Sequence, residues 1–175
     1  MKFITLVLAG AMAVVPVKIQ AQKVSEYHPS VKCLALNMYH EARGQGTAGL
    51  LGVTAVVFNR VKDKRFPNTI CEVIEQGPTR ESWKKNGEFY PIRHRCQFSW
   101  FCDGRSDIPK EIEVYSKFLR IARAMIDKNI PFIDITDGAL FYHADYVTPG
   151  WAKTKRRTTR IGNHIFYRWE IGKKF

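Results

Sequence analysis

The densest cluster of polar side chains in apolar surroundings is the run Tyr-His-Glu-Ala-Arg-Gly at residues 39–44. A carboxylic acid at the end of a largely apolar helix loses contact with water, and this desolvation raises its pKa toward working pH. A protonated acid of this kind can protonate the oxygen of a leaving group. Glu41 is therefore a candidate general acid. The alternative is an exposed glutamate that pairs with Arg43 or a nearby lysine.

The same run does not fit metal or nucleophile chemistry. A zinc-protease helix needs a second histidine four residues after His40, and residue 44 is glycine. Cys96 and Cys102 lie six residues apart, outside the usual spacing of structural zinc ligands. No Gly-x-Ser-x-Gly pattern occurs that would present a nucleophilic serine. We therefore expect neither a metal nor another cofactor.

A second candidate region is the run Cys-Gln-Phe-Ser-Trp-Phe-Cys-Asp-Gly at residues 96–104. Aromatic rings stack on the apolar faces of sugars, and Gln97 and Ser99 can hydrogen-bond to hydroxyl groups. Bases stack on the same rings, so this run does not separate a glycan from a nucleic acid. In the alternative interpretation, Trp100 and its phenylalanine neighbours are core residues. Tyr142 and His143 form a further polar pair, although a histidine there is more often structural.

The chain is strongly basic, with 28 Lys and Arg against 16 Asp and Glu and a formal net charge of +12. A basic surface attracts nucleic acid, anionic lipid or a carboxylate-rich cell wall. A candidate basic face near the C-terminus comprises Lys153, Lys155, Arg156, Arg157 and Arg160. The length of 175 residues fits one domain with a substantial core.

The first residues have the pattern of a secretory signal. Lys2 precedes an apolar run from Phe3 to Val15, which is followed by Pro16 and the small residue Ala21. The run is shorter than the ~20 residues that a membrane helix needs. We therefore expect residues 1–21 to be a signal peptide or a weakly held anchor rather than a stable span, with a buried core helix as the alternative. Export would place the protein in the periplasm or cell wall.

The cysteine count agrees with export. The four cysteines, Cys33, Cys71, Cys96 and Cys102, all follow the signal-like segment. An even number of cysteines in an oxidising compartment predicts two disulfides, for which three pairings are possible.

The elements that position these residues are mostly helical. After a linker at residues 22–30, the apolar periodicity predicts helices over 31–43, 47–61 and 70–76, and an amphipathic helix opened by Asp107 and Pro109 that runs to Lys128. The stretch 77–104 lacks a clean period and is interpreted as a long functional loop with at most one short strand. Strand-like runs at 139–147 and 160–169 follow. Helices first and strands last predict an α+β domain.

Several motifs in one order resemble the SleB-type cell wall hydrolases, a family of spore-cortex-lytic enzymes and related bacterial and phage hydrolases. The resemblance runs from about Val31 to Arg168. It rests on His-Glu-Ala-Arg-Gly at 40–44, Asn-Arg-Val at 59–61, Arg-Phe-Pro-Asn-Thr at 65–69, Cys-Gln-Phe-Ser-Trp at 96–100, Tyr-His-Ala-Asp-Tyr-Val at 142–147, Trp-Ala-Lys at 151–153 and Ile-Gly-Asn-His-Ile-Phe-Tyr at 161–167.

The resemblance implies a catalytic domain over residues 31–175 with a lysozyme- or lytic-transglycosylase-like fold, mainly helical with a small antiparallel sheet near the C-terminus. It implies peptidoglycan as the partner, with no nucleic acid, and the basic face as a contact to the anionic wall. Glu41 matches the family's catalytic glutamate, and the substrate-binding positions are Gln97, Ser99, Trp100, Tyr142 and His143. The motif commonly continues to a second acid, and Gln45 stands there in this chain.

The family favours a single-acid mechanism that cleaves between N-acetylmuramic acid and N-acetylglucosamine and leaves 1,6-anhydro ends. A hydrolytic muramidase would need a second carboxylate, for which Asp103 and Asp145 are the candidates. Two further alternatives are a non-catalytic wall-binding protein and a secreted nucleic-acid binder. Salt-sensitive DNA binding would identify the latter.

Overall fold

The computed structural model describes residues 27–127 and 132–169. In chain order its elements are α1 (Pro29–Ala42), α2 (Gly46–Lys62), α3 (Ile70–Ile74), β1 (Thr79–Glu81), β2 (Phe89–Pro91), the 3₁₀ helix η2 (Ser99–Cys102), α4 (Ile112–Ile126), β3 (Phe141–Ala144), the 3₁₀ helix η3 (Gly150–Thr154), β4 (Arg156–Ile161) and β5 (His164–Arg168). This arrangement confirms the predicted α+β class. The predicted signal segment, residues 1–21, lies outside the described residues.

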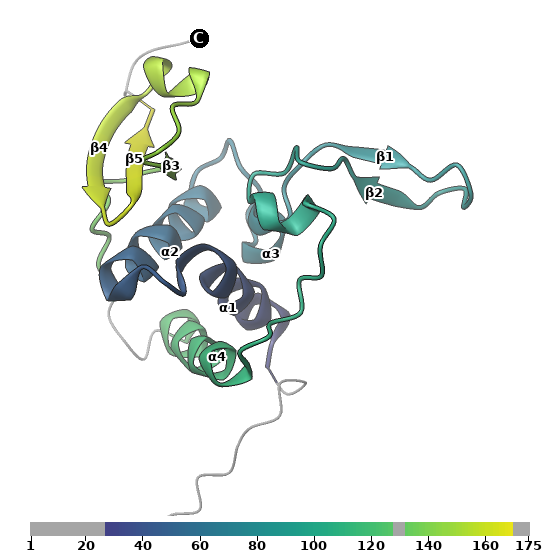
Figure 1. Ribbon diagram of the computed structural model, residues 1–175, viewed down its shortest axis with the longest axis horizontal. Helices are drawn as coiled ribbons and strands as arrows, with labels where there is room; N and C mark the ends of the chain where they lie inside the picture. Colours follow the sequence, from purple (N-terminus) through teal and green to yellow (C-terminus); the bar gives the residue numbers. More distant parts are fainter. Residues whose placement is uncertain (1–26, 128–131, 170–175) are drawn as a thin grey trace, which may run out of the picture.

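The helices form the main body, and the strands lie at its edges (Figure 1). Helix α1 packs against α2, α3 and α4. Its apolar residues Leu34 and Met38 are buried together with Val53 of α2 and Leu119 of α4. A disulfide between Cys33 and Cys71 joins α1 to α3. Within residues 27–127 and 132–169, no helix is both long and apolar enough to cross a membrane.

Helix α2 is buried along most of its length, in agreement with its nearly continuous apolar sequence. One side faces the helical core, and the other meets the C-terminal sheet. A Cβ at Gly52 would lie 2.8 Å from the Phe166 ring of β5, so the glycine permits a close approach between helix and sheet. This contact fixes the sheet relative to the helices.

The C-terminal sheet has three antiparallel strands in the order β3-β5-β4. The prediction of one strand over 160–169 was wrong, because the chain turns at Gly162, where φ is +55°, and divides this region into β4 and β5. Strand β4 is an edge strand with the sequence Arg-Arg-Thr-Thr-Arg-Ile. Its charged side chains discourage pairing with another strand. Because the same side chains make the sequence polar, the strand was not predicted.

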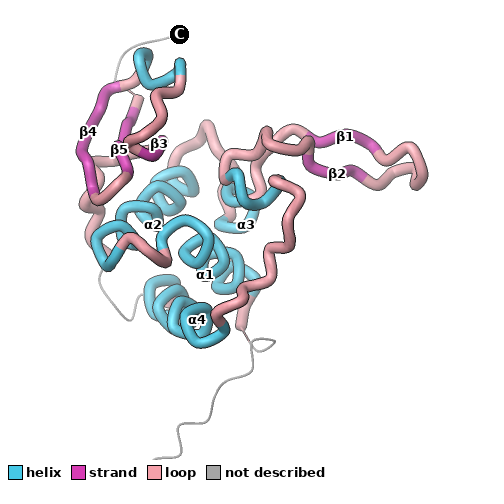
Figure 2. Tube along the Cα trace, in the orientation of Figure 1, coloured by secondary structure: helices cyan, strands magenta, loops and turns pink. Residues whose placement is uncertain are grey.

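The stretch 77–104 contains a hairpin rather than a loop with one strand. Strands β1 and β2 pair in antiparallel register and project from the body as an arm (Figures 1 and 2). Nearly every residue of the two strands is exposed, and Trp83 in the turn is 89% exposed. With both faces in water, the strands lack the apolar alternation that identifies a strand. A disulfide between Cys96 and Cys102 follows the arm, so both predicted disulfides are present.

Helix α4 begins at Ile112, five residues later than the predicted start at Asp107. Side chains of α1 bind the backbone of the preceding segment. The Tyr39 hydroxyl accepts hydrogen bonds from the N–H groups of Lys110 and Glu111 at 3.0 and 3.3 Å, and His40 Nε2 lies 3.1 Å from the Asp107 carbonyl oxygen. Tertiary contacts therefore replace the first helical turn.

Candidate active site

Two predicted site residues, 101 positions apart in the chain, meet where the helices contact the sheet. Glu41 lies in the last turn of α1, and Tyr142 lies on β3. The Tyr142 hydroxyl donates a hydrogen bond of 2.8 Å to Glu41 Oε2. This contact orients the Glu41 carboxyl group.

The surroundings of Glu41 favour its neutral form. Burial raises the pKa of the Glu41 carboxyl, and the hydrogen bond from Tyr142 opposes this rise in part. Burial and the neighbouring carboxylate raise the pKa of Tyr142 well above its usual value, so its hydroxyl remains a donor. The Tyr142 ring is held by His164, Phe166 and Phe98, with ring centroids 5.0, 5.6 and 6.4 Å away. The pair can therefore supply a proton from a fixed position.

Arg60 lies beneath this pair and was not among the predicted site residues. It is a buried cation within the apolar helix α2. Its Nε donates a hydrogen bond of 2.8 Å to the carbonyl oxygen of Leu140, and Asn59 Nδ2 donates one of 3.1 Å to that of Ala139. Together they hold the chain that enters β3. An arginine inside a largely apolar helix is the sequence signal that could have identified this position.

The predicted aromatic platform is largely internal. Trp100 is buried, donates from Nε1 to Asn37 Oδ1 at 3.1 Å, and stacks on His40 with ring centroids 4.6 Å apart. Trp100 therefore occupies a core position, as the alternative interpretation of the sequence proposed. Gln97 and Ser99 are exposed on either side of buried Phe98, which packs near Tyr142. These two polar side chains remain candidates for substrate contact.

His143 is engaged on both ring nitrogens. Nδ1 lies 2.8 Å from the carbonyl oxygen of Ala144, and Nε2 lies 3.0 Å from the Tyr167 hydroxyl. A carbonyl can only accept, so Nδ1 is the donor and Nε2 accepts from Tyr167. The ring also stacks on Tyr167, with centroids 5.2 Å apart. These contacts assign His143 a role in holding the sheet.

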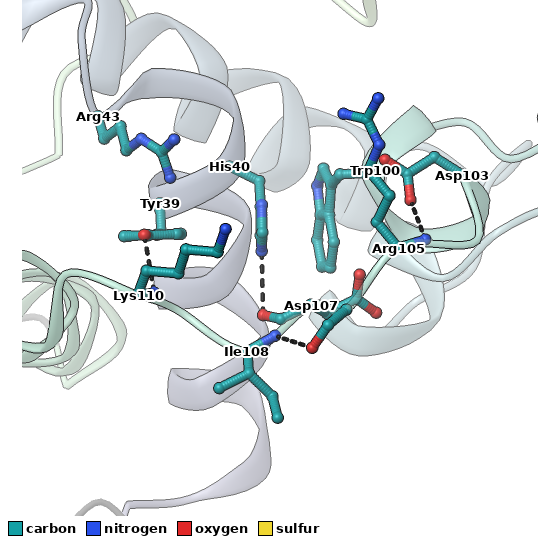
Figure 3. Close-up of a pocket in the computed structure, with 10 residues that line it drawn as sticks. Tyr39, His40, Arg43, Trp100, Asp103, Arg105, Asp107, Ile108 and Lys110 are labelled. Carbon is teal, nitrogen blue, oxygen red and sulfur yellow. Dashed lines mark hydrogen bonds between the residues drawn. The ribbon is translucent and has the colours of Figure 1, made fainter.

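A polar cavity of about 180 Å³ lies between the end of α1 and the segment before α4 (Figure 3). Its lining residues are Tyr39, His40, Arg43, Trp100, Asp103, Arg105, Ser106, Asp107, Ile108 and Lys110. The candidate second carboxylate Asp103 faces this cavity, beyond the His40–Trp100 stack. The other candidate, Asp145, pairs with Arg160 at 2.5 Å.

Gln45 occupies the position where the family motif commonly has a second acid. Its Oε1 lies 3.5 Å from the backbone N–H of Asn163 and would lie 3.0 Å from a Cβ at Gly162. The side chain therefore links the start of α2 to the β4–β5 turn. Among the residues that the structure describes, no group of three or more His, Cys, Asp or Glu side chains could hold a metal ion.

The comparisons with known proteins agree with this architecture. A model of the cell wall hydrolase family matches residues 44–167. The chain belongs to this family. The matched region starts after Glu41, so the assignment of Glu41 depends on the geometry and the motif.

This cell wall hydrolase is 28% identical over 137 residues to the spore cortex-lytic enzyme of Bacillus subtilis, covering 78% of this chain and 36% of the relative. The matched region spans 34% to 43% of the length of the curated spore cortex-lytic enzymes to which this chain is similar. The crystal structure of the Bacillus cereus SleB catalytic domain is similar, with 28% identity, a TM-score of 0.52 and coverage of 79% of this chain and 89% of that one.

The catalytic domain of the germination-specific lytic transglycosylase SleB from Bacillus anthracis is also 28% identical. It has a TM-score of 0.53, with 82% of this chain and 98% of that one covered. These likenesses confirm the resemblance that the motifs indicated and the fold that it implied.

Proposed function

We propose that this protein cleaves the glycan strands of peptidoglycan between N-acetylmuramic acid and N-acetylglucosamine, as a lytic transglycosylase with Glu41 as its catalytic acid. The observation that carries the proposal is the hydrogen bond from Tyr142 to Glu41, within surroundings whose burial raises the pKa of the carboxyl. A non-catalytic wall-binding protein has no need of a desolvated, oriented acid. The similarity to a named lytic transglycosylase supports the reaction type.

In the first step, the Glu41 proton moves to the glycosidic oxygen as the bond from that oxygen to muramic C1 breaks. The glucosamine portion leaves with a new hydroxyl group, and Glu41 becomes a carboxylate. In the second step, the carboxylate takes the proton of the muramic C6 hydroxyl while O6 bonds to C1. The 1,6-anhydro ring is closed, Glu41 is protonated again, and no water is consumed.

A single acid suffices for this route because the attacking hydroxyl belongs to the substrate and ring closure is intramolecular. Two-carboxylate hydrolysis needs a partner about 5–9.5 Å from Glu41. Asp145 is engaged by Arg160, and Asp103 accepts a hydrogen bond from the backbone N–H of Arg105. The partner that contacts the Glu41 carboxyl is the Tyr142 hydroxyl and not a second carboxylate, which supports the single-acid route.

We further propose that residues 1–21 direct export and that residues 31–175 act in the periplasm or cell wall. Two disulfides in a member of this family indicate an extracytoplasmic location. Arg156 and Arg157 are exposed on β4 and supply a basic face for the anionic wall. The expectation that the protein does not bind nucleic acid remains a prediction.

Mass spectrometry of fragments released from purified peptidoglycan tests this function. We expect muramic ends lighter by one water than those released by a lysozyme, and release by Glu41→Gln that is lower by roughly 10²–10⁴. Glu113→Gln, at an exposed acid of α4, is the matched control and should behave as wild type. Hydrated muramic ends would reject the transglycosylase step alone, while glucosamine or peptide ends would also reject the bond specificity.

A further inference from the structure

Arg60 combines deep burial with incomplete pairing. The residue is 4% exposed, and its guanidinium carbon lies 5.1, 5.3 and 5.7 Å from the ring centroids of Phe66, Phe98 and Phe141. Within the described part of the chain, Nη1 is buried without a hydrogen-bond partner. A buried charge that lacks a counter-ion is unfavourable, so its presence requires an explanation.

A structural role accounts for only part of this arrangement. The bond from Nε to Leu140 anchors the entry to β3, but Asn59 already anchors the adjacent carbonyl of Ala139. Apolar residues of similar volume often replace buried charges without loss of stability. Packing and anchoring therefore explain the size of the side chain and one of its donors, but not its positive charge.

The charge lies next to the Tyr142–Glu41 pair. Leu140, which Arg60 holds, is two residues before Tyr142, and the Phe98 ring contacted by the guanidinium also packs against the Tyr142 ring. Burial lowers the pKa of Arg60 to about 10, so the group remains a cation at neutral pH. Its charge acts on Tyr142 and opposes the effect of burial on the pKa of that hydroxyl.

We propose that Arg60 is a positioning residue that acts through Tyr142: it holds the strand carrying Tyr142 and supplies the positive charge that stabilises the Glu41 carboxylate after proton transfer. The cation polarises the Tyr142 hydroxyl and strengthens its hydrogen bond to an ionised Glu41. Glu41 can then give up its proton in the first step and retain its charge until it acts as base. This inference rests on the proposed function.

Other titratable groups contribute to the pH dependence of this region. Glu41 approaches from α1, and His164 of β5 packs against the Tyr142 ring, with burial lowering its pKa. Lys155, which follows η3, lies 4.5 Å from the Phe141 ring centroid. None of these groups is substituted in an Arg60 variant, so a shift of the Glu41 titration reports the loss of Arg60, and the comparison with Arg60→Lys isolates its charge.

The test compares Arg60→Gln, which keeps a donor near Leu140, with Arg60→Lys, which keeps the charge. Arg120→Met, at an exposed arginine of α4, is the control. The carbon-13 signal of the Glu41 side chain is titrated by NMR without substrate, and glycan cleavage is measured across pH. Circular dichroism and thermal melting show that each variant folds.

We expect Arg60→Gln to move the Glu41 titration and the alkaline limb of activity to higher pH, because the carboxylate has lost a stabilising charge. Arg60→Lys should restore most of the wild-type titration. In a double-mutant cycle with Tyr142→Phe, the two changes should be non-additive by roughly two- to a hundredfold in rate, the usual range for residues in one network.

An unchanged Glu41 titration in folded Arg60→Gln would overturn the inference, even if activity fell at every pH. If Arg60→Gln does not fold, Arg60→Lys decides: a Glu41 titration like that of wild type supports the inference, and a titration shifted to higher pH despite the retained cation overturns it. Wild-type protein that fails to cleave peptidoglycan would reject the proposed function, whereas the substrate-free titration would still report on Arg60.

Discussion

Replacement of Tyr142 by phenylalanine isolates the contribution of one hydrogen bond to the acid. The ring keeps its packing against Phe98 and Phe166, and the donor to Glu41 Oε2 at 2.8 Å is removed. A hydrogen bond to a charged group contributes roughly 1.5–3 kcal/mol. Because about 1.4 kcal/mol is a tenfold change in an equilibrium, the ratio of protonated to ionised Glu41 at a given pH should rise roughly ten- to a hundredfold.

The direction of the pKa change depends on whether the Tyr142 hydrogen bond stabilises the protonated or the ionised form of Glu41. Tyr142 donates to the carboxylate and lowers the pKa of Glu41, so its removal raises that pKa. The alkaline limb of the pH–rate profile should therefore move to higher pH, while the plateau rate falls because a weaker acid donates less readily. Tyr90→Phe, at an exposed tyrosine of β2, is the control. An alkaline limb that stays in place or moves to lower pH would refute this reasoning.

Three further predictions concern the acid, the two disulfides and the basic face. Glu41→Gln should lower activity by roughly 10²–10⁴ yet raise the melting temperature at pH 7. The pKa of Glu41 is raised in the folded state, so the wild-type protein loses stability as pH rises above the pKa of the unfolded chain, and glutamine avoids this loss. An equal gain in melting temperature at pH 4 would contradict this explanation. Loss of the Cys33–Cys71 bridge, with its sequence separation of 38, should cost about 4 kcal/mol in chemical denaturation, against about 2 kcal/mol for Cys96–Cys102 with its separation of 6. Arg157→Gln should weaken sedimentation with purified walls at low salt more than at high salt, and equal weakening would exclude an electrostatic contact.

The sequence predicted the elements whose packing has a clear period. Helices α1 and α2 carry apolar residues that face the common core, and all four of their observed bounds lie within two residues of those predicted. The arm β1–β2 and the edge strand β4 were missed for one shared reason. The arm is exposed at nearly every position and β4 at half of its positions, so neither shows the burial pattern that distinguishes a strand from a polar loop.

The site was predictable to the extent that it is local. Glu41 could be proposed from its position at the end of an apolar helix, and Tyr142 from a motif that the family shares. Their contact spans 101 positions and depends on how β3 docks against α2, which no local pattern encodes. Arg60 was missed because its role depends on three aromatic rings from separate segments.

The contacts that hold β3 also determine the position of Tyr142 relative to Glu41. Gly52 lets β5 approach α2, and Asn59 and Arg60 bind two successive carbonyl groups at the entry to β3. A shift of β3 would therefore break contacts on both sides of the strand as well as the bond to Glu41. Burial of Glu41 lowers the stability of the folded state at neutral pH. The contacts that hold β3, the strand that carries Tyr142, offset this loss of stability. The residues that stabilise the junction between helices and sheet are thus the same residues that set the geometry of the acid.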